Sequence, residues 1–312
     1  MNNPKISVVV PVIERYHDLR KLFTEYSQPL KARGLTFEFI FVVDGVHNDA
    51  FQALKGLRQE FPEIRIIKFA RNFFEAVALM VGFEHARGDI IFTLSAYFQV
   101  VPDVMNTMLD ELEHGYDLVI TRREPRQDNI INRVQAAVFH GLIKNFTNFS
   151  FKDISCGLRC MRAEVAKGLN LTGDMHRFIP ILAFQQGYKI SELPAQQREE
   201  DKKLRFYGIG VYVRRMIDII SLFFIIKFTR KPLRFFGLIG STVFVMGTLI
   251  TAYLGYARLF LNEALADRPM VLLGMLLMVL GVQVSSLGLL GELIIFTHAR
   301  NIKEYHIAEI IE

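Results

Sequence analysis

Two long apolar stretches near the C-terminus constrain this chain most. Phe235–Ala257 carries no formal charge, and Met270–Thr297 carries only one, at Glu292. A helix needs about 20 apolar residues to cross the hydrocarbon core of a bilayer. Two buried core helices of a soluble protein are the alternative, but such helices are seldom this long. The sequence therefore predicts two transmembrane helices within residues 235–300.

The charges flanking these stretches predict their orientation. The segment between them balances its charges, whereas basic residues precede the first stretch, at Lys227, Arg230, Lys231 and Arg234. Cytoplasmic flanks carry the excess of Lys and Arg, and the N-terminus has no signal-peptide pattern. We therefore expect residues 1–208 and the tail 301–312 in the cytoplasm, with residues 209–234 as an amphipathic region in the membrane interface.

Glycines recur along both stretches and predict close contact between helices. They are Gly240, Gly247, Gly274, Gly281 and Gly288. Small residues of this kind let helix backbones approach each other in membranes. From the sequence, the contact could lie within one chain or between copies in a homo-oligomer.

Residues 1–208 have the pattern of an α/β domain. Short β-rich runs are predicted as strands at Ile6–Val12, Phe37–Val43, Ile64–Phe69, Ile90–Leu94 and Leu118–Thr121. Helical spacing separates them at Leu19–Ala32, Asp49–Glu60 and Ala76–Ala86. This alternation, with strands that are nearly continuous apolar runs, predicts a mainly parallel sheet covered on both faces. Ligands bind beyond the carboxyl ends of the strands in such sheets.

Polar residues follow these runs where a ligand is expected. Glu14 and Arg15 follow the first run, Asp44 and Gly45 the second, and Arg71 and Asn72 the third. The fourth run is followed by Ser95-Ala96-Tyr97-Phe98-Gln99. Each motif alone is weak, since Asp-Gly is often only a turn. Together they predict a cleft for a base, a ribose and a pyrophosphate.

At these positions the sequence resembles family 2 glycosyltransferases of the GT-A fold, specifically polyprenyl- and dolichyl-phosphate sugar transferases. The resemblance is carried by VVVPVIE, VVDG, FARNFFEAVALMVGFEHARGDIIF, DISCGLRCMR, HRFIPILAFQQGYKISELP, RKPLRFFGLIG and LGVQVSSLGLLGELI. It implies transfer of a hexose from a nucleotide-sugar to a membrane polyprenyl phosphate at the cytoplasmic face. It implies no nucleic-acid partner.

The sequence departs from this family where a metal ion is usually held. The family has Asp-Ala-Asp-Leu-Gln at Ser95–Gln99, and Gly-Asp at Cys156-Gly157. Mg²⁺ and Mn²⁺ prefer charged oxygen ligands, and the two cysteines, Cys156 and Cys160, lack the spacing of a metal site. We therefore expect no bound metal, or weak binding of Mg²⁺ or Mn²⁺ through Gln99 and Asp44.

Two functions remain open from the sequence. The chain could be a transferase in which arginines replace the metal. Alternatively, it could be an inactive homologue that binds polyprenyl phosphate or regulates an active paralogue.

The resemblance also implies roles for individual residues. The nucleotide would be bound by Pro11, Glu14, Asp44, Asn72, Ser95 and Tyr97. The acceptor phosphate would be bound by Arg123, Arg126 and Arg133. Catalysis would involve Asp153, Arg198 and Gln99, with Asp153 as general base or orienting group and Arg159 as its near neighbour.

Overall fold

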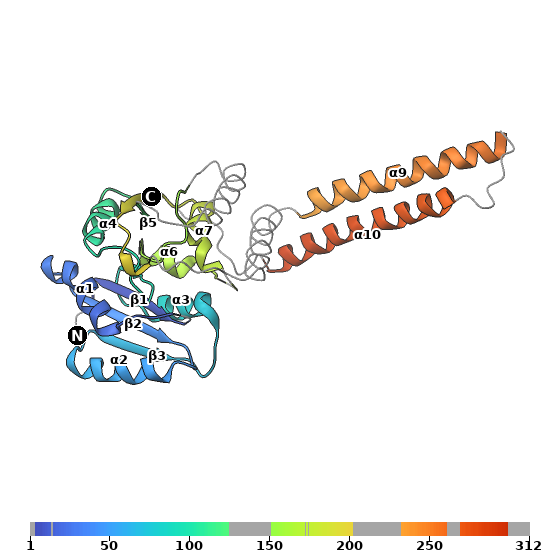
Figure 1. Ribbon diagram of the computed structural model, residues 1–312. Coiled ribbons are helices and arrows are strands. Elements are labelled where there is room, and N and C mark those ends of the chain that lie inside the picture. Colours follow the sequence, from blue (N-terminus) through green and yellow to red (C-terminus); the bar gives the residue numbers. More distant parts are fainter. Residues whose placement is uncertain are drawn as a thin grey trace. The chain divides into compact units, whose positions relative to one another are not determined.

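The computed structural model describes residues 4–13, 15–124, 151–171, 173, 175–201, 232–260 and 269–298. The chain divides into two compact units. Described residues up to 201 belong to the first unit, and those from 232 to 298 belong to the second (Figure 1).

A seven-stranded sheet forms the centre of the first unit. Its order is β3-β2-β1-β4-β6-β5-β7. The strands are β1 (Ile6–Val12), β2 (Phe37–Val43), β3 (Ile64–Lys68), β4 (Ile90–Thr93), β5 (Leu118–Arg123), β6 (Arg159–Arg162) and β7 (Ile190–Ala195). Only β6 runs antiparallel to its neighbours, β4 and β5. The predicted α/β fold with a mainly parallel sheet is confirmed.

Helices cover both faces of this sheet. They are α1 (Leu19–Ala32), α2 (Asn48–Glu60), α3 (Phe74–His85), α4 (Val104–Glu113), α6 (Ala163–Gly168), η1 (Met175–Phe178), α7 (Ile179–Gln185) and η2 (Glu199–Asp201). Helices α1, α2 and α4 pack together, whereas α3 contacts β1, α6 and η1. A Cβ at Gly82 of α3 would overlap the Val9 side chain, so glycine permits this close packing.

The strands and helices predicted within residues 1–208 fit the structure to within two residues at their ends. All of β1 is buried, as its unbroken apolar run predicts. The predicted set lacked the strands β6 and β7 and the helices α4, α6, η1, α7 and η2. Strand β6 reads Arg-Cys-Met-Arg, which has neither the length nor the apolar pattern of a strand.

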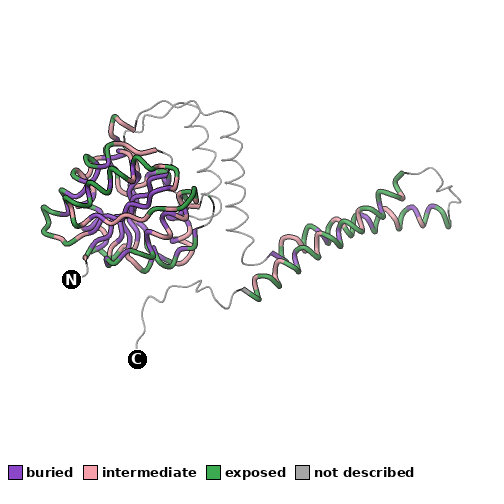
Figure 2. The backbone as a smooth tube through the Cα atoms, turned by 90° about the horizontal axis from the view of Figure 1, so that it is seen from below, coloured by how far each residue is buried: buried purple, intermediate pink, exposed green. Residues whose placement is uncertain are grey.

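The described part of the second unit consists of two long helices, α9 (Pro232–Phe260) and α10 (Pro269–His298). Each is long and apolar enough to cross a membrane, with mean hydropathies of 1.8 and 2.2. Figure 2 contrasts their largely exposed surface with the buried strands of the first unit. Exposed apolar side chains such as Leu238, Leu249 and Leu272 suit contact with lipid tails.

Glycines join these two helices within one chain. A Cβ at Gly240 would lie 2.6 Å from the Gly281 carbonyl oxygen, and one at Gly247 would lie 2.7 Å from that of Gly274. Larger residues would force the backbones apart. Where α9 begins and α10 ends, Glu292 Oε2 accepts a hydrogen bond from the Leu233 backbone N–H at 3.3 Å. Glu292 therefore satisfies a backbone donor in the first turn of α9.

Candidate functional site

Asp44 follows the last residue of β2 and is fully buried. Neither of its carboxylate oxygens has a hydrogen-bond partner among the described residues. The next residue, Gly45, lies against the loop after β3, because a Cβ there would be 2.6 Å from the Arg71 backbone nitrogen. Buried polar groups are nearly always hydrogen-bonded. Both carboxylate oxygens of Asp44 are therefore open to a donor from outside the described residues.

Gln99 is the centre of a hydrogen-bond network at the position where the resembled family holds a metal. Its Oε1 accepts hydrogen bonds from the Gly157 N–H at 2.7 Å and from Ser95 Oγ at 3.1 Å. Its Nε2 donates to Tyr97 Oη at 3.0 Å. A Cβ at Gly157 would overlap Ser95 Oγ, so serine at 95 and glycine at 157 fit together. The two departures from the family pattern are thus structurally coupled.

These side chains do not fit a divalent cation. Ser95 and Gln99 are neutral, and burial raises the pKa of Tyr97 to about 12, with nearby Glu75 and Asp201 adding to the shift. Two donors already occupy the amide oxygen of Gln99. Among the described residues, no group of three or more His, Cys, Asp or Glu side chains could hold a metal. Ser95, Tyr97 and Gln99 therefore offer a hard cation no charged oxygen.

Arg15 lies next to the hydrogen-bond network of Ser95, Tyr97 and Gln99. Arg15 was not among the site residues predicted from the sequence. Its guanidinium carbon is 4.4 Å from the centroid of the Tyr97 ring. Its Nη2 donates to the Glu200 carbonyl oxygen at 2.9 Å and lies 2.9 Å from His17 Nε2. The position of Arg15 after β1 was the available signal, but its neighbours come from distant segments.

Arg123 and Asp153 form a buried ion pair at the end of β5. Arg123 Nε donates to Asp153 Oδ2 at 2.8 Å, and the two side chains are 10% and 3% exposed. Arg123 Nη1 also donates to Asp201 Oδ2 at 3.1 Å. Burial disfavours the charge on Arg123, but Asp153 and Asp201 hold its pKa well above the usual value. The structure therefore brings together two residues that the sequence assigned to separate roles.

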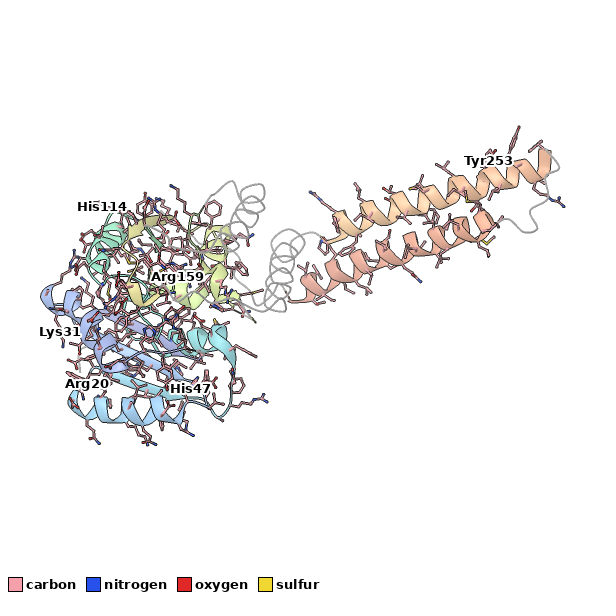
Figure 3. All side chains as sticks on the ribbon, in the orientation of Figure 1. Arg20, Lys31, His47, His114, Arg159 and Tyr253 are labelled. Carbon is pink, nitrogen blue, oxygen red and sulfur yellow. The ribbon has the colours of Figure 1, made fainter. Side chains whose placement is uncertain are left out.

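Arg159 is a near neighbour of Asp153, but the described hydrogen bonds of Arg159 go to backbone carbonyls. It is buried within the first unit (Figure 3) and donates to the backbone carbonyl oxygens of His176 at 3.0 Å and Ile154 at 3.1 Å. Burial lowers its pKa, although the charge of Asp153 acts to raise it. Arg159 is the first residue of β6, and its guanidinium binds the segments before and after that strand.

Arg198 is also neutralised by carboxylates. It forms ion pairs with Glu25 and, at 2.8 Å, with Glu200. Its hydrogen bond lowers the pKa of Glu200 to about 2. Its backbone N–H donates to the Gln99 carbonyl oxygen at 2.9 Å, which ties it to the network of Gln99.

The remaining predicted site residues have local structural roles or lie outside the described residues. Pro11 is buried inside β1 opposite Val42. Asn72 Oδ1 accepts from the Phe74 N–H at 2.9 Å. Phe74 has a φ of 63°, a left-handed conformation that suits the glycine usual in the resembled family. Glu14, Arg126 and Arg133 lie outside the described residues.

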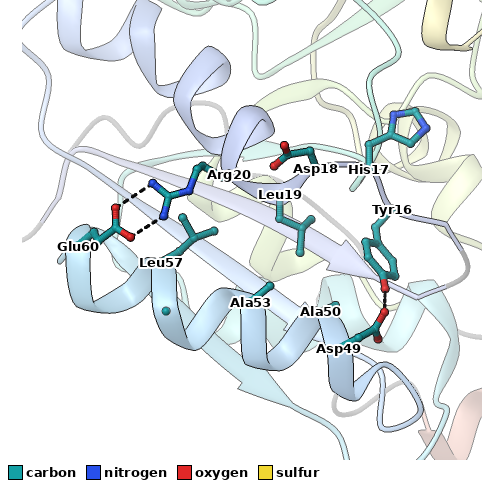
Figure 4. Close-up of a pocket in the computed structure, with 11 residues that line it drawn as sticks. Tyr16, His17, Asp18, Leu19, Arg20, Asp49, Ala50, Ala53, Leu57 and Glu60 are labelled. Atoms are coloured by element: carbon teal, nitrogen blue, oxygen red, sulfur yellow. Dashed lines mark hydrogen bonds and ion pairs between the residues drawn. The ribbon is translucent and has the colours of Figure 1, made fainter.

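A cavity of about 470 Å³ lies between α1 and α2 (Figure 4). Its lining includes Tyr16, His17 and Leu57. At its ends, Tyr16 hydrogen-bonds to Asp49, and Arg20 pairs with Glu60. Asp44, Tyr97 and Gln99 do not line it, so this cavity is not the candidate site.

Known proteins are similar in sequence to this chain over most of its length. The family described as glycosyl transferase family 2 matches residues 7–169. The dodecaprenyl-phosphate galacturonate synthase of Rhizobium johnstonii is 28% identical over 302 residues, which cover 95% of this chain and 89% of that protein. The undecaprenyl-phosphate 4-deoxy-4-formamido-L-arabinose transferase of Edwardsiella ictaluri is 30% identical over 311 residues, covering 98% and 94% respectively.

Solved structures share the fold of the first unit. Glucosyl-3-phosphoglycerate synthase from Mycobacterium tuberculosis, in complex with Mg²⁺ and uridine diphosphate, has a TM-score of 0.54 and 16% identity, covering 71% of this chain and 78% of that one. A complex of the same enzyme with Mn²⁺, uridine diphosphate and phosphoglyceric acid has the same TM-score at 15% identity and the same coverage. At these identities the likeness shows the fold alone.

Proposed function

Since this chain belongs to glycosyl transferase family 2, we propose that it transfers a hexose from a nucleotide-sugar to the phosphate of a membrane polyprenol. The names of the relatives support a polyprenyl phosphate acceptor. They give no support to an inactive homologue.

The buried Asp44 carboxylate is the observation that carries this proposal. A carboxylate with two unpartnered oxygens costs free energy until donors reach it. The hydroxyls of a ribose and the N–H groups of a base are such donors. Asp44 stands at the carboxyl end of β2, where nucleotides bind in open α/β sheets.

The acceptor chemistry fits the ion pair of Arg123 and Asp153. A phosphate monoester has its second pKa near 6, so a polyprenyl phosphate at neutral pH is already a nucleophilic anion and needs no general base. We therefore assign Asp153 to orienting Arg123. Arg123 would contact the acceptor phosphate, together with Arg126 and Arg133.

Anchoring in the membrane follows from the acceptor. A long polyprenol stays in the bilayer, so the domain of residues 1–208 must remain at its surface. We propose that residues 209–234 lie in the interface, that residues 235–300 span the membrane twice, and that both termini are cytoplasmic. The glycine-lined surfaces of α9 and α10 already contact each other. Assembly into a homo-oligomer, or with an active paralogue, would therefore use other surfaces of the chain.

The orientation predicts which residues an external reagent can reach. Single cysteines placed in the segment between α9 and α10, at Asn262 or Ala266, should react with a membrane-impermeant maleimide in intact cells. A cysteine at exposed Gln59 of α2 should react only after the cells are broken. Labelling of Gln59→Cys in intact cells would contradict the proposed orientation.

Removing the charge of Asp44 should weaken nucleotide binding. Hydrogen bonds to a charged group contribute about 1.5–3 kcal/mol, so Asp44→Asn should bind nucleoside diphosphate about tenfold more weakly or worse. Calorimetric titration of the full chain in detergent measures this.

Asp110→Asn is the matched control for this experiment. Asp110 is an exposed aspartate of α4 that pairs with Arg33, and its change should leave binding unaltered. The same preparations should transfer sugar to undecaprenyl phosphate, and unchanged transfer in Asp44→Asn would remove Asp44 from the site.

The use of a divalent cation is a separate part of this proposal. The structural neighbours were solved with Mg²⁺ or Mn²⁺ beside uridine diphosphate. We propose that this chain does not require a divalent cation, because Ser95, Tyr97 and Gln99 supply no charged oxygen to hold it. Transfer that persists in excess chelator would support this proposal.

A further inference from the structure

Sugar transfer from a nucleotide-sugar needs positive charge beside the diphosphate. The bond between the anomeric carbon and the diphosphate oxygen breaks, and its electron pair leaves with the nucleoside diphosphate. A phosphate oxygen of the acceptor forms the new bond to that carbon. Groups that stabilise charge developing on the leaving group contribute strongly to catalysis. Since the donor set here does not fit a cation, a side chain must supply this charge.

Two of the site's arginines are already offset by carboxylates. Arg123 is paired with Asp153 and Asp201. Arg198 is paired with Glu25 and Glu200. Each therefore brings little net positive charge to an anionic ligand.

Arg15 differs because it has no carboxylate partner among the described residues. Its described contacts are with a backbone carbonyl, an imidazole nitrogen and an aromatic ring, at Glu200, His17 and Tyr97. Both of its described hydrogen-bond contacts involve Nη2, which leaves Nε and Nη1 without a described partner. The guanidinium is thus charged, partly buried and able to donate.

Tyr97, which stands where the resembled family has a metal ligand, packs against this guanidinium. In the resembled family the second aspartate of the metal motif stands at residue 97. Here the Tyr97 ring presents its face to Arg15 at 4.4 Å, an arrangement favourable to a cation. The phenol is fixed by Gln99, which is itself fixed by the Gly157 backbone. The residues that replace the metal ligands therefore position an arginine.

We infer that Arg15 supplies the positive charge opposite the donor diphosphate, where related transferases hold a divalent cation. The inference rests on the proposed function, because it concerns the same donor site. Arginine suits this task, since its planar fork can donate two hydrogen bonds to phosphate oxygens.

Nucleotide binding without metal tests this inference. The full chain in detergent with excess chelator is titrated with the diphosphates and monophosphates of uridine, guanosine, adenosine, cytidine and thymidine. We expect at least one diphosphate to bind more tightly than its monophosphate. Arg15→Ala and Arg15→Gln should weaken diphosphate binding about tenfold or more and leave monophosphate binding nearly unchanged. Arg15→Lys should be intermediate, because it keeps the charge but loses the planar fork.

Arg20→Gln is the matched control, since Arg20 is an exposed arginine of α1 paired with Glu60. It should bind diphosphate as the unmodified chain does, and thermal melts should show each variant folded. The inference is overturned if the Arg15 variants keep the preference for diphosphate. It is also overturned if the unmodified chain binds no diphosphate without a divalent cation.

A separate transfer assay tests the proposed function independently of the role of Arg15. Nucleotide-sugars and undecaprenyl phosphate are supplied to the unmodified chain, with and without Mn²⁺. If no sugar is transferred under either condition, the proposed function fails, and the binding titration still decides the role of Arg15. If sugar is transferred in chelator and Arg15→Ala lowers kcat far more than it raises KM, Arg15 acts on the leaving diphosphate.

Discussion

Asp153→Ala should lower the free energy of unfolding of the first unit by about 3–5 kcal/mol. Removing one member of a buried ion pair has a cost of this size, because the other charge stays buried without its partner. Arg123 would be that charge, at 10% exposure, with Asp201 as its remaining carboxylate. Chemical denaturation of the full chain in detergent, followed by the tyrosine signal of the first unit, measures the loss.

Arg122→Ala provides the matched control on the same strand. Arg122 pairs with Glu124, whose side chain is 58% exposed, and exposed pairs contribute only about 0–1 kcal/mol. Full stability of Asp153→Ala would contradict the stabilising ion pair, and unchanged sugar transfer by Asp153→Ala would contradict its orienting role.

The double variant Ser95→Asp, Tyr97→Asp should make nucleotide binding respond to manganese. It places two carboxylates beside Gln99, and Mn²⁺ bound there could bridge to a diphosphate. We expect Mn²⁺ to tighten binding of the preferred nucleoside diphosphate about tenfold or more. In chelator the same variant should bind more weakly than the unmodified chain, because Arg15 has lost the Tyr97 ring beneath it.

The double variant Ser95→Asn, Tyr97→Asn separates charge from shape. Asparagine has nearly the size of aspartate but no negative charge, so this variant should show no response to manganese. The unmodified chain should respond little. A strong manganese requirement in the unmodified chain would overturn our account of the site.

Local pattern was sufficient for the fold class. The strands β1 and β2 and the helix α1 have the predicted bounds. Buried parallel strands are continuous apolar runs, and in helices apolar residues recur about every three or four positions. The two apolar helices follow from length and composition alone. Strand β6 escaped prediction because its four residues join the sheet through pairing with β4 and β5, and no local pattern records such pairing.

The candidate site was predictable only in part. Its place beyond the strand ends, and the residues Asp44, Ser95, Tyr97 and Gln99, followed from the sequence, because parallel strands bring their carboxyl ends to one edge. The charge state of each arginine was decided by tertiary structure alone. Arg123 meets Asp153 thirty positions along the chain, and Arg198 meets Glu25 from 173 positions away. Which arginine lacks a carboxylate partner depends on such distant contacts, so the sequence could place Arg15 after β1 but could not show that its charge is uncompensated.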